Sequence, residues 1–255
     1  MYKRQVWGVP IPVFYCKDCG QEIVTPATID KLARTIEKES SDVWVKMPAK
    51  YLLPTAFKCP HCGSRNFAKE KDIMDVWFDS GITHRAVVEK RHKELGHLPV
   101  EMYLEGSDQH RGWFQSSLLT AVATSGRAPY LTVLTHGFVL DGEGRKMSKS
   151  LGNTVAPQDI IKLYGADVLR LWAASVDYRN DVKIGETAIK QMVEIFKKMR
   201  NTSRFLLGNL YDFDPIADYV YYKDLKAIDK FALHKLNTLI ANVTEAFDNY
   251  EFYKY

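Results

Sequence analysis

Cysteine is scarce in this chain, with only four among 255 residues. So few cysteines exclude a disulfide-dense secreted scaffold, which compensates for a small core with several cross-links. No apolar run approaches the roughly 20 residues of a membrane-spanning helix, so no membrane partner is expected. The first residues also lack the apolar stretch of a secretion signal, and the expected compartment is the cytoplasm.

A strong charge of one sign is missing too. Lysine and arginine number 35 against 31 aspartate and glutamate residues, which gives a net charge of +4 at pH 7. This balance permits a polyanionic partner without requiring one, because a dedicated nucleic-acid binder concentrates its basic residues more strongly. Internal repeats and low-complexity tracts are absent, and the length suits one large domain or two small ones.

The first 75 residues hold all the cysteines and are expected to be loop-rich. Residues 9–15 contain two prolines and are predicted to be extended, since proline restricts its own backbone and that of its predecessor. Stripes of apolar residues at spacings of three and four predict two amphipathic helices, over residues 189–199 and 236–247. Two shorter helices are expected around residues 160–164 and 168–174.

The middle of the chain has the pattern of a strand, a helix and a second strand. Residues 100–104 are of strand type, Ser107 or Asp108 is suited to cap a helix that ends at Gly126, and residues 131–140 form the next apolar run. A succession of this size predicts a parallel βαβ unit.

The cysteines form two Cys-x-x-Cys pairs, each followed by glycine, which can take the positive φ of a tight knuckle. Four thiolates suit a closed, tetrahedral, structural Zn²⁺ site. A redox Cys-x-x-Cys is the alternative, and it is disfavoured because both pairs end in glycine. The 39 residues between the pairs exceed a compact ribbon spacing, so the metal would staple a longer excursion. The expected ligands are Cys16, Cys19, Cys59 and Cys62.

A second motif is the pentapeptide Lys-Met-Ser-Lys-Ser at residues 146–150. Two lysines three residues apart can bring two ammonium groups to one polyphosphate, and each offers a compact point charge with three donors. Stabilising the charge of a leaving pyrophosphate is a large catalytic effect. For an isolated pentapeptide the alternative, a solvated basic loop, is the commoner situation.

A third group of polar residues follows the first predicted strand, at the edge where open α/β sheets bind ligands. Glu105 is suited to pair with an ammonium group, and Asp108 either accepts from a ribose hydroxyl or only caps the helix. Trp113 is suited to the core as well as to a pocket wall, and the same two alternatives hold for Trp77.

These motifs together resemble the class I aminoacyl-tRNA synthetases. The pentapeptide matches the signature loop of that family, and its flanks agree, with Gly137-Phe138 before it and Leu151-Gly152-Asn153 after it. The segments 103–114 and 75–81 are similar to the isoleucyl enzymes of the family. Residues 4–12 resemble the point where the chain of those enzymes re-enters the catalytic core after an editing insertion.

The resemblance implies a role for each matched residue. Lys146 and Lys149 would act on the triphosphate of ATP, with Lys149 as the direct contact, and Glu105 would bind the α-amino group of isoleucine. The adenylate would contact Asp108 and Gln109 beside Gly106. The amino-acid pocket would be walled by Trp77 and Trp113, and the adenine would lie near His136 and Gly137. Zinc occurs in the connecting region of several isoleucyl enzymes, and Mg²⁺ would accompany ATP.

The resemblance also implies a fold and a division into segments. The expected fold is α/β: the C-terminal half of a Rossmann-like, parallel-sheet catalytic domain with a zinc-binding connective segment, followed by helices. The segments are residues 1–75 (zinc-binding), 76–150 (catalytic half), 151–184 (helical, contacting the tRNA stem) and 185–255 (start of a truncated anticodon-binding bundle).

Two features of the family are missing from the sequence: the His-x-Gly-His signature that helps bind ATP, and the editing domain. The chain therefore resembles an internal fragment whose parent, expected to be a monomer, joins isoleucine to tRNA(Ile) with ATP. Alone, the chain is expected to be inactive. Two other functions are a non-catalytic, zinc-stapled tRNA-binding module and a stand-alone zinc-ribbon protein, and the latter leaves the lysine loop unexplained.

Overall fold

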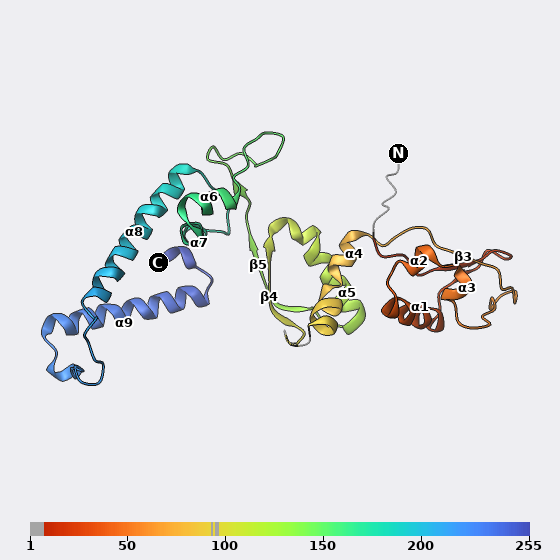
Figure 1. Ribbon diagram of the computed structural model, residues 1–255, viewed down its shortest axis with the longest axis horizontal. Helices are drawn as coiled ribbons and strands as arrows, with labels where there is room; N and C mark the ends of the chain where they lie inside the picture. Colours follow the sequence, from red (N-terminus) through yellow and green to blue (C-terminus); the bar gives the residue numbers. More distant parts are fainter. Residues whose placement is uncertain (1–7, 93, 95–96) are drawn as a thin grey trace. The chain divides into compact units, whose positions relative to one another are not determined.

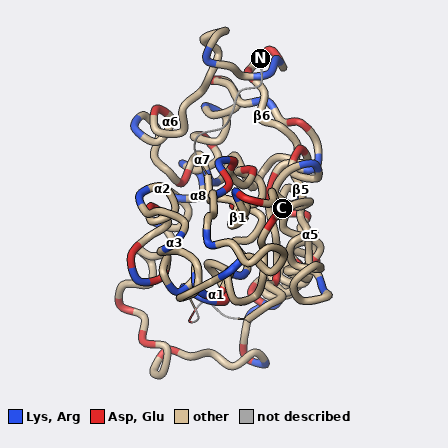
Figure 2. The backbone as a smooth tube through the Cα atoms, turned by 90° about the vertical axis from the view of Figure 1, so that its right-hand side faces the viewer, with Lys and Arg blue, Asp and Glu red and all other residues tan. Residues whose placement is uncertain are grey.

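The chain folds into two compact units in a computed structural model that describes residues 8–92, 94 and 97–255 (Figure 1). The first unit comprises Met1–Tyr103 and Asp108–Val133, and the second comprises Leu104–Ser107 and Leu134–Tyr255. The first residues of the matched segment 4–12 lie outside the described part. Lysine and arginine are interspersed with aspartate and glutamate along the backbone (Figure 2).

The cysteine-bearing part of the first unit is built on a small antiparallel sheet. Its strands are β1 (Phe14–Cys16), β2 (Glu22–Ile23) and β3 (Phe67–Lys69), in the order β2-β1-β3. Phe14 pairs with Ile23 on one side and with Lys69 on the other. The extended conformation predicted for residues 9–15 is confirmed, with no helix there.

Three helices fill the excursion between the cysteine pairs: α1 (Pro26–Lys38), α2 (Val43–Lys46) and α3 (Ala49–Leu52). The expectation of a loop-rich segment is therefore wrong for residues 26–38. Thr25 and Thr28 form a reciprocal capping box at the start of α1, and Pro26 occupies its first turn, where no N–H is needed. These helices close over the sheet in one core, made of Phe14, Cys16, Ile23, Leu32, Val43, Trp44, Ala49, Leu52, Leu53 and Cys59.

The rest of the first unit contains the helices α4 (Val76–Gly81), η1 (His84–Arg91) and α5 (Trp113–Ser125). The strands β4 (Val100–Gly106) and β5 (Tyr130–His136) pair with each other and run on into the second unit. Val100 N–H donates to Pro129 O at 2.9 Å, so the strands begin side by side. With α5 between them in the chain, they form the predicted parallel βαβ unit.

In the second unit, β6 (Val139–Leu140) pairs in parallel with β7 (Val182–Lys183), and the four long or medium helices follow the lysine loop. These are α6 (Pro157–Tyr164), α7 (Ala166–Ser175), α8 (Glu186–Gly208) and α9 (Ala227–Asp248). Short 3₁₀ turns, η4 (Tyr222–Asp224) and η5 (Phe252–Lys254), flank α9. No helix in the described part of the chain is both long and apolar enough to cross a membrane.

The predicted second strand, residues 131–140, is broken in the structure. β5 ends at His136 and β6 starts at Val139 in a separate sheet. The break lies at Gly137, whose N–H donates to Tyr178 O at 2.8 Å instead of to a strand neighbour. The stripe predicted on α8 is confirmed as a packing face, because Ile189, Met192, Val193 and Phe196 join the core around Val168 and Trp172.

Candidate functional site

The four cysteine sulfurs come together, although 39 residues separate the two pairs. All four Sγ atoms lie within 4.8 Å of one another. Cys16 Sγ is 3.6 Å from Cys62 Sγ, and Cys19 Sγ is 3.7 Å from Cys59 Sγ. Four sulfurs at about 2.3 Å from a tetrahedral zinc ion would be about 3.8 Å apart, so the spacing fits that metal.

Each pair forms the same backbone turn. Gly20 N–H donates to Cys16 O at 2.8 Å, and Gly63 N–H donates to Cys59 O at 2.9 Å. Both glycines have a positive φ, 73° and 74°, which a residue with a side chain rarely adopts. Asp18 joins the two turns, because its carboxylate accepts from Ser64 Oγ at 2.5 Å.

The donors also suit a metal chemically. Burial raises the pKa of the Cys16 thiol, but the backbone N–H groups of Cys19 and Asp18 outweigh burial and lower that pKa to about 6. All four cysteines are free thiols, two buried and two exposed. Thiolates arranged in this way fit structural Zn²⁺, and no disulfide occupies them.

The end of β4 carries the residues predicted to meet isoleucine and the adenylate. Glu105 is exposed and Gly106 is buried, both in the second unit. Asp108 and Gln109 follow in the 3₁₀ turn η3 (Ser107–Arg111) of the first unit, where Gln109 Nε2 donates to Asp108 Oδ2 at 3.4 Å.

The predicted helix cap is wrong: neither Ser107 nor Asp108 caps α5. The 3₁₀ turn intervenes, Gly112 stands at the N-cap position, and Gln109 Oε1 accepts from Trp113 N–H at 2.9 Å. The side chain of Asp108 is thus not used by the helix and stays exposed. A Cβ at Gly112 would lie 2.5 Å from Gln109 Oε1, so this turn requires glycine.

The two tryptophans predicted to wall the pocket lie on either side of that turn, in the first unit. Trp77 is 48% exposed, and its ring would be 3.1 Å from a Cβ at Gly112. Asp75 caps α4 beneath it by accepting from Trp77 N–H at 2.8 Å. Trp113 is half-buried and donates from Nε1 to Ser80 O at 3.0 Å. Trp113 therefore packs between elements, whereas Trp77 presents its ring to solvent.

At the end of β5, His136 Nδ1 lies 2.8 Å from Gly137 O. Gly137 packs against another stretch of backbone, since a Cβ there would be 2.4 Å from the carbonyl of Asn180. Phe138 N–H donates to Asp181 Oδ1 at 2.7 Å. The residues predicted to lie near the adenine are thus fixed by the segment that precedes β7.

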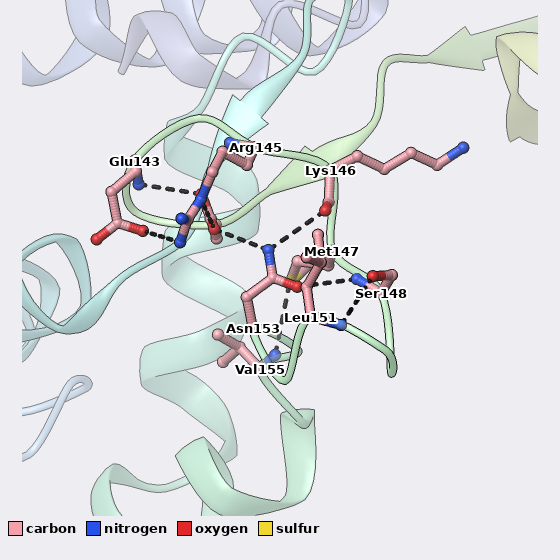
Figure 3. A network of polar contacts seen from close by, with 9 residues as sticks. Glu143, Arg145, Lys146, Met147, Ser148, Leu151, Asn153 and Val155 are labelled. Carbon is pink, nitrogen blue, oxygen red and sulfur yellow. Dashed lines mark hydrogen bonds and ion pairs between the residues drawn. The ribbon is translucent and has the colours of Figure 1, made fainter.

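The lysine loop is held from inside by two polar side chains that sequence reasoning did not single out (Figure 3). Asp141 is buried and accepts from Arg145 N–H at 2.8 Å and from Asn153 Nδ2 at 2.8 Å. Their only sequence signal is their position in the flanks of the matched motif. Lys146 and Lys149 are both exposed, and Lys146 Nζ lies 5.7 Å from the centre of the Phe138 ring.

A family model described as tRNA synthetases class I (I, L, M and V) matches residues 1–185. The chain is 59% identical to isoleucine–tRNA ligase of Caldicellulosiruptor bescii over 98% of this chain and 27% of that protein. It is 58% identical to isoleucine–tRNA ligase of Caldanaerobacter subterraneus over 99% of this chain and 27% of that protein. The chain thus spans about a quarter of the length of these relatives.

Solved structures share the fold. The LeuRS of Agrobacterium radiobacter K84, in a ternary complex with tRNA and LeuAMS, matches with a TM-score of 0.72 at 21% identity, over 97% of this chain and 33% of that one. Methionyl-tRNA synthetase of Mycobacterium tuberculosis, in complex with methionyl-adenylate, matches with a TM-score of 0.58 at 18% identity, over 91% and 50%. With the family model covering most of its length, this chain belongs to the class I tRNA synthetases of the isoleucine, leucine, methionine and valine group.

Proposed function

We propose that this chain supplies the lysine-loop half of the active site of an isoleucine–tRNA ligase. The choice of isoleucine rests on the identity to isoleucine–tRNA ligases along nearly the whole chain. The observation that carries the chemistry is the loop itself. Its backbone is held by Asp141 and Asn153, while the side chains of Lys146 and Lys149 make no hydrogen bond or ion pair with the described residues.

The reaction needs little from the protein beyond placement and charge. The isoleucine carboxylate attacks the α-phosphorus of ATP, the bond to the bridging oxygen breaks, and pyrophosphate leaves with that electron pair. The aminoacyl group then passes from the adenylate to a hydroxyl of the terminal ribose of tRNA(Ile), and AMP leaves. Two lysine ammonium groups stabilise the negative charge that grows on the departing pyrophosphate. Bound Mg²⁺ would supply further charge neutralisation on the phosphates.

The remaining residues bind and orient the reactants. Glu105 is proposed to pair with the isoleucine ammonium group, and Asp108 and Gln109 to contact the adenylate beside Gly106. Trp77 and Trp113 are proposed as walls of the amino-acid pocket.

His136 and Gly137 are proposed to lie against the adenine, and Cys16, Cys19, Cys59 and Cys62 to hold a structural zinc ion. The four-part division at residues 75, 150 and 184 is proposed as the domain organisation.

The chain alone is proposed to be inactive, because the sequence holds no His-x-Gly-His motif to grip the triphosphate from the other side. Groups that act as a unit are strongly non-additive, so half of the set retains little of the rate. The test is isoleucine-dependent exchange of pyrophosphate into ATP. We expect background exchange from the chain alone, and exchange above background once the remaining parts of the complete ligase are supplied.

Lys149→Ala in the complete ligase is the specific test of the loop. The expected result is a much slower adenylate formation with little change in isoleucine binding, because the lost charge acts mainly in the transition state. Lys162→Ala, on the exposed side of α6, is the matched control and should leave the rate unchanged. If Lys149→Ala is as fast as the control, the non-catalytic tRNA-binding module becomes the better reading.

A further inference from the structure

Asp141 is a buried carboxylate at the entrance of the lysine loop, only 4% exposed. Its Oδ1 accepts from Glu143 N–H at 3.1 Å and from Arg145 N–H at 2.8 Å. Its Oδ2 accepts from Arg145 Nε at 2.9 Å and from Asn153 Nδ2 at 2.8 Å. The Asn153 amide, the Arg145 N–H and the Arg145 guanidinium hold the pKa of Asp141 well below its usual range, so the carboxylate stays ionised at neutral pH.

Asn153 occupies the exit of the same loop and uses both ends of its amide. Nδ2 donates to Asp141 Oδ2 and, at 3.3 Å, to Lys146 O. Oδ1 accepts from Ser148 N–H at 2.9 Å. One side chain thus joins the entrance of the loop to the backbone on both sides of Met147, within the segment that carries the two lysines (Figure 3).

Met147 fixes the third point. Its side chain packs against the core of Ile160, Val168, Trp172, Ile184 and Ile189, and its Sδ accepts from Val155 N–H at 3.4 Å. The loop backbone is therefore held between a buried carboxylate and an apolar core. The lysine side chains on either side of Met147 point away from these anchors and are exposed.

We propose that Asn153, clamped to Asp141, is a positioning residue that sets where Lys146 and Lys149 stand before ATP arrives. This role deepens the proposed function and rests on it. The physical reason is that lysine has a long, flexible stem, so its charge can be aimed only if the backbone beneath it is fixed. A charge placed in advance stabilises a transition state without reorganisation, whereas a wandering one must first be ordered.

The test uses Asn153→Ala in the complete ligase. We expect kcat for isoleucine-dependent pyrophosphate exchange to fall about tenfold or more, as for loss of hydrogen bonds that organise a charged group, with KM for isoleucine nearly unchanged. Asn209→Ala is the matched control, because that amide also bonds a backbone carbonyl, Phe205 O at 2.7 Å, but lies at the end of α8. Control kinetics should match the unmodified enzyme.

A double-mutant cycle separates positioning from mere stability. If Asn153 acts through the loop lysine, adding Asn153→Ala to Lys149→Ala should slow the reaction little further, because the charge to be aimed is already gone. A general loss of structure would instead multiply the two effects. Trypsin supplies a second measurement: cleavage after Lys146 and Lys149 in the folded ligase should be faster in Asn153→Ala than in the control.

Should Asn153→Ala fail to fold, Asn153→Ser, which keeps a polar atom on Cβ, takes its place in the same assays. Full kcat in a folded Asn153 variant, or multiplicative effects in the cycle, overturns the positioning role while leaving the proposed function intact. Full kcat in Lys149→Ala itself overturns the proposed function, and the positioning role with it.

Discussion

The indole of Trp113 lies flat on the phenol ring of Tyr103, with ring centroids 4.2 Å apart and planes 7° from parallel. Tyr103 OH shares a hydrogen bond with Ser117 Oγ at 3.0 Å, and Trp113 Nε1 donates to Ser80 O at 3.0 Å. One stacked pair therefore joins strand β4 to helices α4 and α5. Whatever Trp113 contributes to an amino-acid pocket, it also holds together the elements that form the pocket's base.

Replacing Trp113 with phenylalanine keeps an aromatic ring on Tyr103 but leaves Ser80 O without its donor. We expect the free energy of unfolding of the chain to fall by about 1 kcal/mol or more from the lost hydrogen bond. Trp113→Ala, which also removes the stack, should cost about 3–5 kcal/mol. Urea unfolding followed by circular dichroism measures both. Tyr211→Phe, at a side chain that is 86% exposed, is the control, and a Trp113→Phe curve that coincides with it would refute the structural role.

Sequence patterns predicted the elements whose spacing carries a physical requirement. Two knuckles ending in glycine require four sulfurs to meet, and they do, and the α8 stripe is buried as its period demands. The start of α5 could not be predicted in this way. Ser107 and Asp108 have the right chemistry for a cap, but the 3₁₀ turn follows from a tertiary contact, Trp77 against Gly112, that no local pattern contains.

The same limit applies to the lysine loop and to the second strand. The motif predicted the exposed lysines, but not that Asn153 would bond backward to Asp141 twelve residues earlier. Residues 131–140 have strand-type side chains throughout, and only the approach of the Asn180 backbone explains the break at Gly137. Contacts between segments distant in sequence decided each of these details.

Zinc removal should unfold the cysteine-bearing part of the first unit. Cys62→Ser is the sharpest variant, because this thiol is exposed and its loss removes a ligand with little loss of packing. We expect about one equivalent of zinc in the unmodified chain by elemental analysis, and far less, with a lower Tm, in the variant. A chelator should lower the Tm of the unmodified chain in the same way.

His61→Ala is the control for the zinc experiment. His61 lies between Cys59 and Cys62 and is exposed, but it does not belong to the sulfur cluster. Its loss should leave both zinc content and Tm unchanged. Less than half an equivalent of zinc in unmodified chain purified without chelators would show that the site does not hold this metal.

The hydrogen bond from Tyr15 OH to Glu70 Oε2, at 2.6 Å, should make stability depend on pH. It raises the pKa of Tyr15 to about 12 and lowers the pKa of Glu70. The stabilisation from the phenol is therefore complete below its unfolded pKa of about 10 and is lost as the pH rises toward 12. The stabilisation from the carboxylate is complete above its unfolded pKa of about 4.3 and is lost as the pH falls further.

Tyr15→Phe tests this assignment. The difference in unfolding free energy between the unmodified chain and the variant should be constant from about pH 5 to pH 9 and shrink above about pH 10, as the unfolded phenol ionises. Urea unfolding at a series of pH values measures it, with Tyr211→Phe as the control. A difference that stays constant up to pH 12 would mean that the two side chains are not bonded in solution.

Gly137→Ala should be the most damaging single-methyl change in the second unit. The new Cβ would lie 2.4 Å from the carbonyl carbon and oxygen of Asn180, which are backbone atoms and cannot rotate away. The segment before β7 would have to shift, breaking the bond from Gly137 N–H to Tyr178 O, and overpacking of this kind typically costs about 1–3 kcal/mol. Gly208→Ala, with nothing within 4 Å of the added Cβ at the end of α8, should be neutral or slightly stabilising. Because His136 precedes the strained bond, the complete ligase carrying Gly137→Ala should also show a higher KM for ATP than the Gly208→Ala ligase. Equal Tm values for the two variants would mean that the two segments do not approach as closely as this, and the proposed place of the adenine beside Gly137 would lose its structural support.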